Sequence, residues 1–342
     1  MFELLNTLYV LTPGASLHLD HDAVRVVVDH ETQLRAPLVR LDSFVLFGPV
    51  SVSPWLIHRC ADDGRAITFM SSGGRFKARL EGPVRGNVLL RRSQHVALDD
   101  SDQPSRLARQ FVAGKIQNSR LVLLRGARDS SGERSVDLQY GADKLADVLQ
   151  RLPSIEGLEL VRGAEGEAAR SYFEAFGALI RAKDASFRFD LRTRRPPRDR
   201  TNALLSFLYA LLREECAGAL EGVGLDPQIG YLHALRPGRP ALALDLMEEL
   251  RSLVADRLAV TLINRRQLQA DHFEVLEGGA VRLTDGGRRC VLSAYQERKK
   301  RPVAHRLLRQ KVALGLVPHV QARLLARHLR GDLVHYPPYV AR

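Results

Sequence analysis

Three carboxylates and one imidazole stand out in this sequence as groups that could do chemistry. Glu165 lies in the run Arg162-Gly163-Ala164-Glu165-Gly166, which we expect at the start of a core helix. His233 follows a glycine-containing loop, and Asp245 and Glu248 stand three residues apart, as neighbours on one helix face. Together these residues form a hard, mostly oxygen ligand set, which suits Mn²⁺ or Mg²⁺ better than structural Zn²⁺.

Each of these residues also has an ordinary structural explanation. An acid such as Glu165 in the first turn of a helix complements the helix dipole. A single histidine such as His233 is more often a satisfied loop or core residue than a ligand. Asp245 and Glu248 could form a solvated acidic edge, with Arg251 rather than a metal ion between them. Because the residues are far apart in the sequence, a metal site depends on a fold that brings them together.

The composition favours a polyanionic partner. The chain has 342 residues, with 51 Lys and Arg against 39 Asp and Glu, a net charge of +12 and a pI near 10.0. Such a surplus indicates nucleic acid or an anionic membrane surface, although a basic protein without such a partner is also possible. The longest strongly apolar stretch, Ala203 to Leu212, is far shorter than the ~20 residues of a membrane-spanning helix. The beginning of the sequence does not resemble a signal peptide, so we expect the cytoplasm.

Common signatures of other chemistries are missing from the sequence. It contains no Walker A loop, dinucleotide-binding glycine run, Gly-x-Ser-x-Gly elbow or His-Glu-x-x-His motif. Cys60, Cys216 and Cys290 are odd in number and far apart, so they predict neither a zinc site nor a disulfide framework. We expect them to be reduced and structural.

The elements predict an α+β protein. A small N-terminal β domain is expected over residues 1–90, a linker over 91–104 and a larger, mainly α-helical domain over 105–342. Strands are predicted at Leu8–Leu11, Ser16–Leu19, Val24–Val28, Phe44–Phe47, Ala66–Met70 and Arg75–Leu80, with turns at Pro13-Gly14 and Gly73-Gly74 and a short helix at Pro54–Asp63 that ends at Gly64. Helices are predicted at Ser105–Asp129, Gly166–Arg181, Thr201–Leu220, Ala241–Leu253 and from Asp285 to the basic run ending at Arg301, with a hairpin at Phe273–Thr284 and a helical, basic tail from Pro302 to Tyr336-Pro337-Pro338.

The predicted helix at 105–129 is rich in basic residues. They are Arg106, Arg109, Lys115, Arg120, Arg125 and Arg128, opposed only by Asp129. A basic helical face can lie along a phosphate backbone, and it can equally be an ordinary solvated face. Arg236 and Arg239, beside His233, are further candidates for DNA contact.

Short motifs along essentially the whole chain carry a family resemblance. They are Leu5-Asn6-Thr7-Leu8-Tyr9-Val10, Gly73-Gly74-Arg75-Phe76, Gly82-Pro83-Val84, Gly86-Asn87-Val88-Leu89-Leu90-Arg91, Lys115-Ile116-Gln117-Asn118-Ser119-Arg120, Asn202-Ala203-Leu204-Leu205-Ser206 and Arg330-Gly331-Asp332-Leu333 with Tyr336-Pro337-Pro338. With these motifs the chain resembles the integrase subunit of CRISPR adaptation, which inserts new spacers into a CRISPR array. The resemblance is greatest to the type I-C branch.

The resemblance implies roles for the residues chosen above. The family's Glu-Gly pair matches Glu165-Gly166, and its histidine after an Ile-Gly-aromatic step matches His233. It implies that Glu165, His233 and Glu248 are the catalytic metal ligands, with Asp245 in support. Some members carry Asp at the position of Glu248, and Glu249 remains a possible substitute for it. The expected cofactor is Mn²⁺ or Mg²⁺.

The resemblance also implies partners and a fold. It implies a β domain followed by a mainly helical catalytic domain. The partners would be double-stranded and branched DNA, a second copy in a homodimer, a small ferredoxin-like companion protein and, in the type I-C branch, a RecB-like nuclease. We expect no membrane partner, because an amphipathic basic helix with exposed aromatics is missing.

The expected reaction is transesterification. The 3′-hydroxyl of a short DNA fragment would attack a backbone phosphate of the array, and water in its place would give nicking. The alternative is a non-enzymatic DNA-binding regulator, in which Asp256 to Arg301 forms helix, hairpin and helix in a winged arrangement. The two hypotheses differ over Glu165, His233 and Glu248, because a regulator has no use for their convergence.

Overall fold

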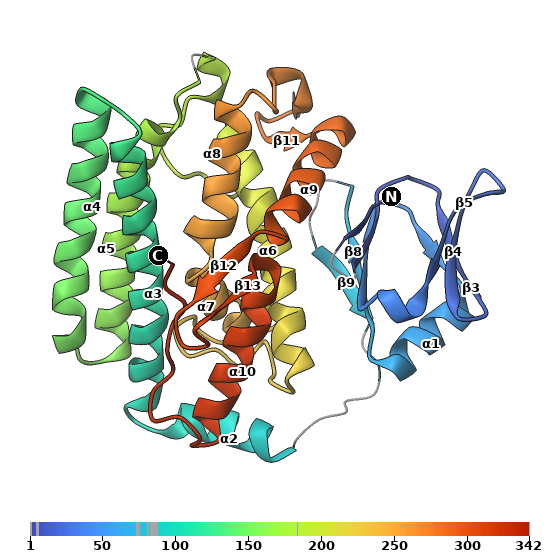
Figure 1. Cartoon of the computed structure of the whole chain (residues 1–342), viewed down its shortest axis with the longest axis horizontal. Coiled ribbons are helices and arrows are strands. Elements are labelled where there is room, and N and C mark those ends of the chain that lie inside the picture. The colour runs from blue at the N-terminus through green and yellow to red at the C-terminus, as the bar shows by residue number, and fades with distance from the viewer. Residues whose placement is uncertain are drawn as a thin grey trace. The chain divides into compact units, whose positions relative to one another are not determined.

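The computed structural model describes residues 2–4, 7–72, 76–80, 82, 88–182 and 184–341. The predicted turn at Gly73-Gly74 and parts of four motifs, Leu5-Asn6, Gly73-Gly74-Arg75, Pro83-Val84 and Gly86-Asn87, lie outside the described residues. The chain divides into two compact units (Figure 1): Met1–Arg85 with Arg282–Glu297, and Gly86–Val281 with Arg298–Arg342.

Over its described residues, the first unit contains two β-sheets. The five-stranded sheet has the order β1-β2-β6-β8-β9, and the four-stranded sheet has the order β5-β4-β3-β7. The strands are β1 (Phe2–Leu4), β2 (Thr7–Val10), β3 (Ser16–Asp20), β4 (Ala23–Val28), β5 (Glu31–Pro37), β6 (Ser43–Phe47), β7 (Ser51–Val52), β8 (Ala66–Met70) and β9 (Phe76–Leu80). In the larger sheet β2, β6 and β8 are parallel, and antiparallel strands β1 and β9 lie at its two edges.

The core of the first unit comes from alternating residues of these strands. Leu17, Val24, Val26 and Phe44 are fully buried, in one cluster with Leu56 of helix α1 (Pro54–Asp63). The helix begins where the Ser53 hydroxyl accepts a bond from the Leu56 amide at 3.4 Å, and it ends at Gly64, whose φ of +70° favours glycine. The six predicted strands and the limits of this helix are confirmed. The edge strand β5 was not predicted. Its side chains are mostly exposed and polar, so the strand lacks the alternation of apolar and polar residues that would indicate it.

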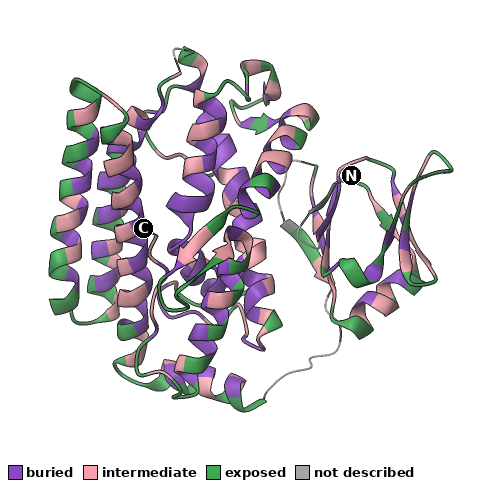
Figure 2. Cartoon of the chain, viewed as in Figure 1, coloured by how far each residue is buried: buried purple, intermediate pink, exposed green. Residues whose placement is uncertain are grey.

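Helices build the second unit. They are α2 (Val88–Asp99), α3 (Gln103–Arg128), α4 (Glu133–Arg151), α5 (Leu158–Phe176), α6 (Arg200–Gly222), α7 (Ala241–Glu248), α8 (Arg257–Asn264), the end of α9 (Asp285–Lys299) and α10 (Val317–Leu329). Helix α3 packs against α4, α5 and α7, and α6 packs against α7 and α10. Figure 2 shows the buried residues of α6 and α7 inside this unit. With the β-rich first unit, the predicted α+β class is confirmed.

Two boundaries differ from the predictions. Helix α5 begins at Leu158, directly after Gly157, whose φ is +82°, so Glu165 lies two turns inside the helix rather than at its start. A Cβ at Gly163 or Gly166 would meet nothing within 4 Å, so these glycines sit in an exposed helix face without breaking it. Most of the expected linker over 91–104 is also helical, because α2 buries Leu90, Gln94 and Ala97.

The C-terminal part combines hairpins with helices. The predicted hairpin is confirmed as β10 (Phe273–Val275) and β11 (Val281–Leu283), with Gly278 and Gly279 at positive φ in its turn. The prediction of a helical tail from Pro302 is wrong over its first residues. There β12 (Pro302–His305) pairs antiparallel with β13 (Gln310–Ala313), and helix α10 begins only at Val317. Pro302 starts the strand, a position where its missing N–H removes no ladder bond.

Two further observations concern partners and cysteine chemistry. Among the described helices, none has the length and apolar character needed to cross a membrane. Cys60, Cys216 and Cys290 are not joined in disulfides, and the first two are buried. Burial raises the pKa of Cys60 to about 11, as expected of an inert, structural thiol.

Candidate metal centre

Two of the predicted acids meet at a buried lysine. The Lys115 ammonium, near the middle of α3, forms an ion pair with Glu165 of α5 and lies 2.7 Å from Oε2 of Glu248 of α7. The side chains of Lys115 and Glu248 are 9% and 3% exposed, whereas that of Glu165 is 27% exposed. The cluster therefore opens to solvent on the side of Glu165.

A second cation holds the other oxygen of Glu248. Nη1 of Arg251 lies 2.7 Å from Oε1 of Glu248, and the Arg251 guanidinium stacks over the Tyr209 ring at 4.5 Å from its centroid. Burial by itself raises the pKa of Glu248, but the charges of Arg251, Lys115 and His233 outweigh it and hold the pKa well below its usual range. Glu248 is therefore ionised at neutral pH, as a metal ligand must be.

Asp245 fixes the third predicted ligand. This fully buried carboxylate accepts bonds from the amides of Tyr231 (2.6 Å), Leu232 (3.0 Å) and His233 (2.9 Å). It also accepts the Nδ1–H of His233 at 2.7 Å, which leaves Nε2 of that ring 3.9 Å from Oε1 of Glu248. A carboxylate behind a histidine ring is the usual way to orient an imidazole toward a metal.

The loop that carries His233 is packed closely on α7. A Cβ at Gly230 would lie 2.6 Å from the backbone carbon of Ala241, so only glycine allows this approach. Arg162 of α5 donates to the carbonyl of Leu232 at 2.6 Å and ties the same loop to the helix of Glu165. These contacts explain why the Ile-Gly-aromatic step places His233 beside the acids.

The residues fit a cation. Oε2 of Glu248 is buried and accepts no hydrogen bond of good geometry, so the charge of Lys115 is what compensates it. Glu165, Glu248 and His233 are the residues here that could hold a divalent ion, and in this structure the Lys115 ammonium lies against both carboxylates. With the lysine between them, no group of three His, Cys, Asp or Glu side chains among the described residues is arranged around one point as a metal site. Two carboxylates and an imidazole form an oxygen-rich donor set, which Mn²⁺ and Mg²⁺ accept.

Glu249 points elsewhere. Its buried carboxylate accepts bonds from the Tyr336 hydroxyl, the Tyr339 amide and, at 3.1 Å, the Gln321 side chain. Burial raises the pKa of Glu249 to about 8, although these three donors act in the opposite direction. Glu249 therefore fastens the C-terminal segment to α7, and Glu248 alone of the pair faces the lysine.

Lys115 was not predicted as a site residue. It was grouped with the basic residues of its helix, but these do not form one face: Lys115 is buried, whereas Arg106 and Arg128 are exposed. Its position could have identified it, because Lys115 follows the buried residues Phe111 and Val112 at helical spacing. A lysine on an apolar stripe indicates a buried acid nearby.

Basic residues gather around the His233 loop. Burial and the nearby charge of Arg236 lower the pKa of Arg239, and Arg195 and Arg162 act in the same direction, against Asp245. The charges of Arg236, Arg195 and Arg162 thus all act on Arg239. Both predicted basic neighbours of His233 belong to this group.

Comparisons with known proteins identify the family. The model of the family "CRISPR associated protein Cas1" matches residues 8–297. A CRISPR-associated endonuclease Cas1 of Moorella thermoacetica is 53% identical over 343 residues, covering 100% of both chains. Another, of Rhodospirillum rubrum, is 51% identical over 99% of both chains. A Cas4/Cas1 fusion of Rhodospirillum rubrum is 35% identical over 98% of this chain and 57% of its own length.

Solved structures show the same fold. A Cas1 protein from Thermotoga maritima has a TM-score of 0.81 and 23% identity, over 95% of this chain and 97% of its own. A casposase bound to an integration product has a TM-score of 0.84 and 20% identity, over 98% and 94%. A chain of a Cas6-RT-Cas1–Cas2 complex has a TM-score of 0.82 and 23% identity, over 98% of this chain and 36% of its own. This chain therefore belongs to the Cas1 family of CRISPR-associated proteins.

Proposed function

We propose that this chain is a divalent-metal-dependent DNA endonuclease and integrase that inserts short DNA fragments into a CRISPR array. The observation that carries the proposal is the position of the Lys115 ammonium, next to the carboxylates of both Glu165 and Glu248. The names of the relatives, endonucleases of CRISPR systems, support the same class of reaction. The fold that the chain shares with a casposase bound to its integration product supports strand transfer.

Glu165, His233 and Glu248 would hold the ion, with Asp245 as the support of His233. When bound, Mn²⁺ or Mg²⁺ would polarise the scissile phosphate and lower the pKa of the attacking hydroxyl. Asp245 holds Nδ1 of His233, so Nε2 is the ring nitrogen that faces Glu248 and would be the ligand atom. Lys115 would have to leave its place between the acids, and its ammonium would then be available to the negative charge of the phosphate.

The reaction exchanges one phosphodiester for another. The 3′-hydroxyl of the incoming fragment gives up its proton as its oxygen forms a bond to the phosphorus, the bond from phosphorus to the leaving 3′-oxygen of the target strand breaks, and that leaving oxygen takes up a proton. The number of phosphodiesters stays the same, so no nucleotide cofactor is needed. The arginines around the His233 loop would hold the DNA backbone. With water as the nucleophile, the same site would nick DNA.

The proposed partners follow from the relatives' names and from the family resemblance. We propose that the chain forms a homodimer and works on double-stranded and branched DNA with a small ferredoxin-like companion. A neighbouring structure is a complex of Cas1 with Cas2, which supports a companion protein. The fusion of a Cas4 exonuclease to a Cas1 endonuclease supports a separate nuclease partner, as expected in the type I-C branch.

The regulator hypothesis is less well supported. Helix α8, the β10–β11 hairpin and helix α9 follow one another as a winged arrangement requires. However, a regulator gains nothing from Glu165 and Glu248 meeting at one ammonium, with His233 beside Glu248. Its DNA binding would survive removal of divalent ions, whereas strand cleavage by the proposed enzyme would not.

The decisive experiment is a cleavage and joining assay on a labelled branched DNA, with Mn²⁺ or with EDTA. Glu165→Gln keeps the shape of a partly exposed side chain and should abolish the reaction while the protein stays folded. Glu167→Gln, on an exposed position of the same helix, is the matched control and should remain active. Metal-independent cleavage, or full activity of Glu165→Gln, would contradict the proposal. Tight DNA binding without any reaction, even with the companion protein added, would favour the regulator.

A further inference from the structure

A buried polar network continues from the candidate metal centre into the helical unit. Arg251, which lies 2.7 Å from Oε1 of Glu248, also stacks on the Tyr209 ring of α6. The Tyr209 hydroxyl donates at 2.6 Å to Oδ1 of Asp256, and the Tyr172 hydroxyl of α5 donates at 3.0 Å to the other oxygen of this carboxylate. Asp256 is only 2% exposed. The network thus runs from Glu248 to a second buried acid, which the proposed function does not use.

A π-helix brings the two charged residues of this network to one side. Arg251 directly precedes η5 (Ser252–Asp256), in which a backbone bond spans five residues instead of four. In a regular α-helix, residues five apart point to different sides, because one turn has about 3.6 residues. The wider π turn reduces this difference, so Arg251 and Asp256 both reach Tyr209. Such π turns are frequent at functional sites.

The Tyr209 ring is held from several directions. Besides its bond to the buried carboxylate, it contacts a second guanidinium, that of Arg192, at 5.3 Å from the ring centroid. Arg192 itself donates to Oδ1 of Asn202 at 2.7 Å and to the Ser206 hydroxyl at 3.1 Å, both on α6. Tyr209 therefore offers Arg251 a fixed surface, and cation–π contacts are strongest when they are shielded from water.

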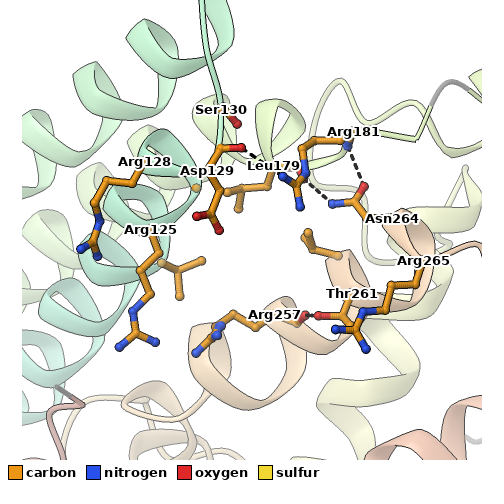
Figure 3. Close-up of a pocket in the computed structure, with 13 residues that line it drawn as sticks. Arg125, Arg128, Asp129, Ser130, Leu179, Arg181, Arg257, Thr261, Asn264 and Arg265 are labelled. Atoms are coloured by element: carbon orange, nitrogen blue, oxygen red, sulfur yellow. Dashed lines mark hydrogen bonds between the residues drawn. The ribbon is translucent and has the colours of Figure 1, made fainter.

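The π-helix has an arginine at each end, and the two lie in different environments. Arg257 lines a separate cavity beside Arg125 and Arg128 (Figure 3). Burial lowers the pKa of Arg257, and the nearby charge of Arg125 lowers it further. Burial by itself also lowers the pKa of Arg251, but the charges of two buried acids outweigh it and hold this pKa well above its usual range. Arg251 is thus the flanking arginine that the fold directs at the acids.

Arg251 decides which oxygen of Glu248 is available to a ligand. It occupies Oε1, whereas Oε2 accepts no hydrogen bond of good geometry and faces the Lys115 ammonium. If Lys115 gives way to an ion, Oε2 becomes free while Arg251 stays on Oε1. A planar guanidinium that stacks on a ring is less easily displaced than a flexible lysine side chain. Glu248 would therefore offer a cation one oxygen rather than two.

We propose that Arg251, held by Tyr209 and Asp256, is a positioning residue that makes the site select Mg²⁺ or Mn²⁺ over Ca²⁺. The proposal rests on the proposed function for the presence of the ion. Ca²⁺ takes more oxygen ligands than Mg²⁺ and often binds both oxygens of one carboxylate, whereas the smaller Mg²⁺ keeps a strict octahedral arrangement. Restricting Glu248 to one oxygen therefore costs Ca²⁺ more than it costs Mg²⁺.

The test is the ratio of Ca²⁺ affinity to Mg²⁺ affinity, measured without DNA. Mn²⁺ is the probe: its EPR signal reports the free ion, and Mg²⁺ or Ca²⁺ is titrated as the competitor. Arg251→Met frees Oε1 of Glu248 and should raise the ratio about tenfold. Arg257→Met, the matched control, removes the same charge from the other end of η5 and should keep the wild-type ratio. The loss of one charge acts on both divalent ions alike, so it cancels in the ratio.

A milder pair of variants makes the test independent of the folding of Arg251→Met. Tyr209→Phe keeps the ring but removes its bond to Asp256, so the ratio should rise by a smaller factor. Tyr172→Phe removes the bond to the other oxygen of Asp256 and leaves the ring beside Arg251 unchanged, so the wild-type ratio should persist. Thermal melting in EDTA shows whether each variant is folded. General damage to the site would weaken the binding of both ions and leave their ratio unchanged.

The same ratio in the wild type, Arg251→Met and Tyr209→Phe would overturn the inference. An equal rise in the two controls, or a wild type that does not bind Mn²⁺, would overturn it as well. The outcome is separate from that of the proposed function. A protein that lacks nuclease activity can still show the ratio that depends on Arg251, and an active nuclease can lack it.

Discussion

Nζ of Lys115 lies 2.7 Å from Oε2 of Glu248, so an ammonium neutralises a carboxylate that the proposed function assigns to a divalent ion. The pair joins α3 to α7, and Glu165 of α5 shares the same ammonium. Lysine and metal would therefore compete for one position. Such a competition would mean that the Lys115 side chain stabilises the metal-free protein and that a bound metal ion would displace it.

Lys115→Met tests this competition. In EDTA the variant should unfold more easily by about 3 kcal/mol, because two buried or partly buried acids lose their shared partner. Mn²⁺ should then raise its melting temperature more than it raises that of the wild type. Lys144→Met, at a partly exposed position of α4, is the control and should leave the effect of Mn²⁺ unchanged. An equal effect of Mn²⁺ on Lys115→Met and wild type would show that the lysine does not occupy the ion's place.

Glu248→Gln and Glu165→Gln should differ in stability although both lose activity. Glu248 is 3% exposed and pairs with the buried Arg251, so the amide leaves a buried guanidinium without its counter-ion. The cost should be about 3 to 5 kcal/mol. Glu165 is more exposed, and its substitution should cost about 1 kcal/mol or less. Chemical denaturation of both variants in EDTA measures the difference, and similar costs would contradict the buried pairing.

Asp245→Asn should weaken metal binding without removing a ligand. The side-chain amide has an N–H donor where Asp245 has an acceptor, so it cannot accept from all the N–H groups that now donate to Asp245. The loop at Tyr231–His233 and the His233 ring would therefore lose their orientation. The expected loss in Mn²⁺ affinity or in activity is about 10- to 100-fold. Calorimetric titration with Mn²⁺ measures it. Unchanged affinity would mean that Asp245 only holds the loop.

Glu249 predicts a pH dependence of stability. Its pKa is raised to about 8 in the folded protein, against 4.5 for the ordinary side chain. Between these values the folded protein binds a proton that the unfolded chain does not, so the free energy of unfolding should fall as pH rises from about 4.5 to 8. The loss should be on the order of a few kcal/mol. Urea denaturation across this range should give a clear slope for the wild type and a smaller one for Glu249→Gln. Equal slopes would assign the dependence to other groups.

Local signals in the sequence were sufficient for several elements. Helix α1 begins after Ser53 and ends at Gly64, because a hydroxyl cap and a left-handed glycine are visible in the sequence itself. The same holds for the hairpin at Gly278-Gly279. For the site, the choice of Glu165, His233 and Glu248 came from residue types and from the family resemblance. These residues lie together, but their role as ligands stays a prediction.

Other features depend on contacts that local patterns do not contain. Gly163 and Gly166 suggested that α5 starts late, yet they lie on an exposed face, where a missing side chain costs little packing. The residues after Pro302 contain helix formers, but the pairing of Val303 with Val312 makes them strands. Lys115 was read as a surface charge, because only the packing of α3 on α5 and α7 reveals its two acidic partners.

The contacts between the C-terminal segment and Glu249 also support the neighbouring cluster of Lys115, Glu165 and Glu248. Tyr336 and Tyr339 reach this side chain from about ninety positions away, and the amide of Ala341 donates to Asn118 from still farther along the chain, at 3.0 Å. The ends of a chain are among the segments that open locally at the lowest free energy. We expect proteolytic cleavage after Leu329 to remove the contacts that the C-terminal segment makes with α7. The cleavage should abolish activity, although Glu165, His233 and Glu248 all remain in the protein. Limited proteolysis followed by titration with Mn²⁺ would show whether the cleaved protein loses its affinity for the metal.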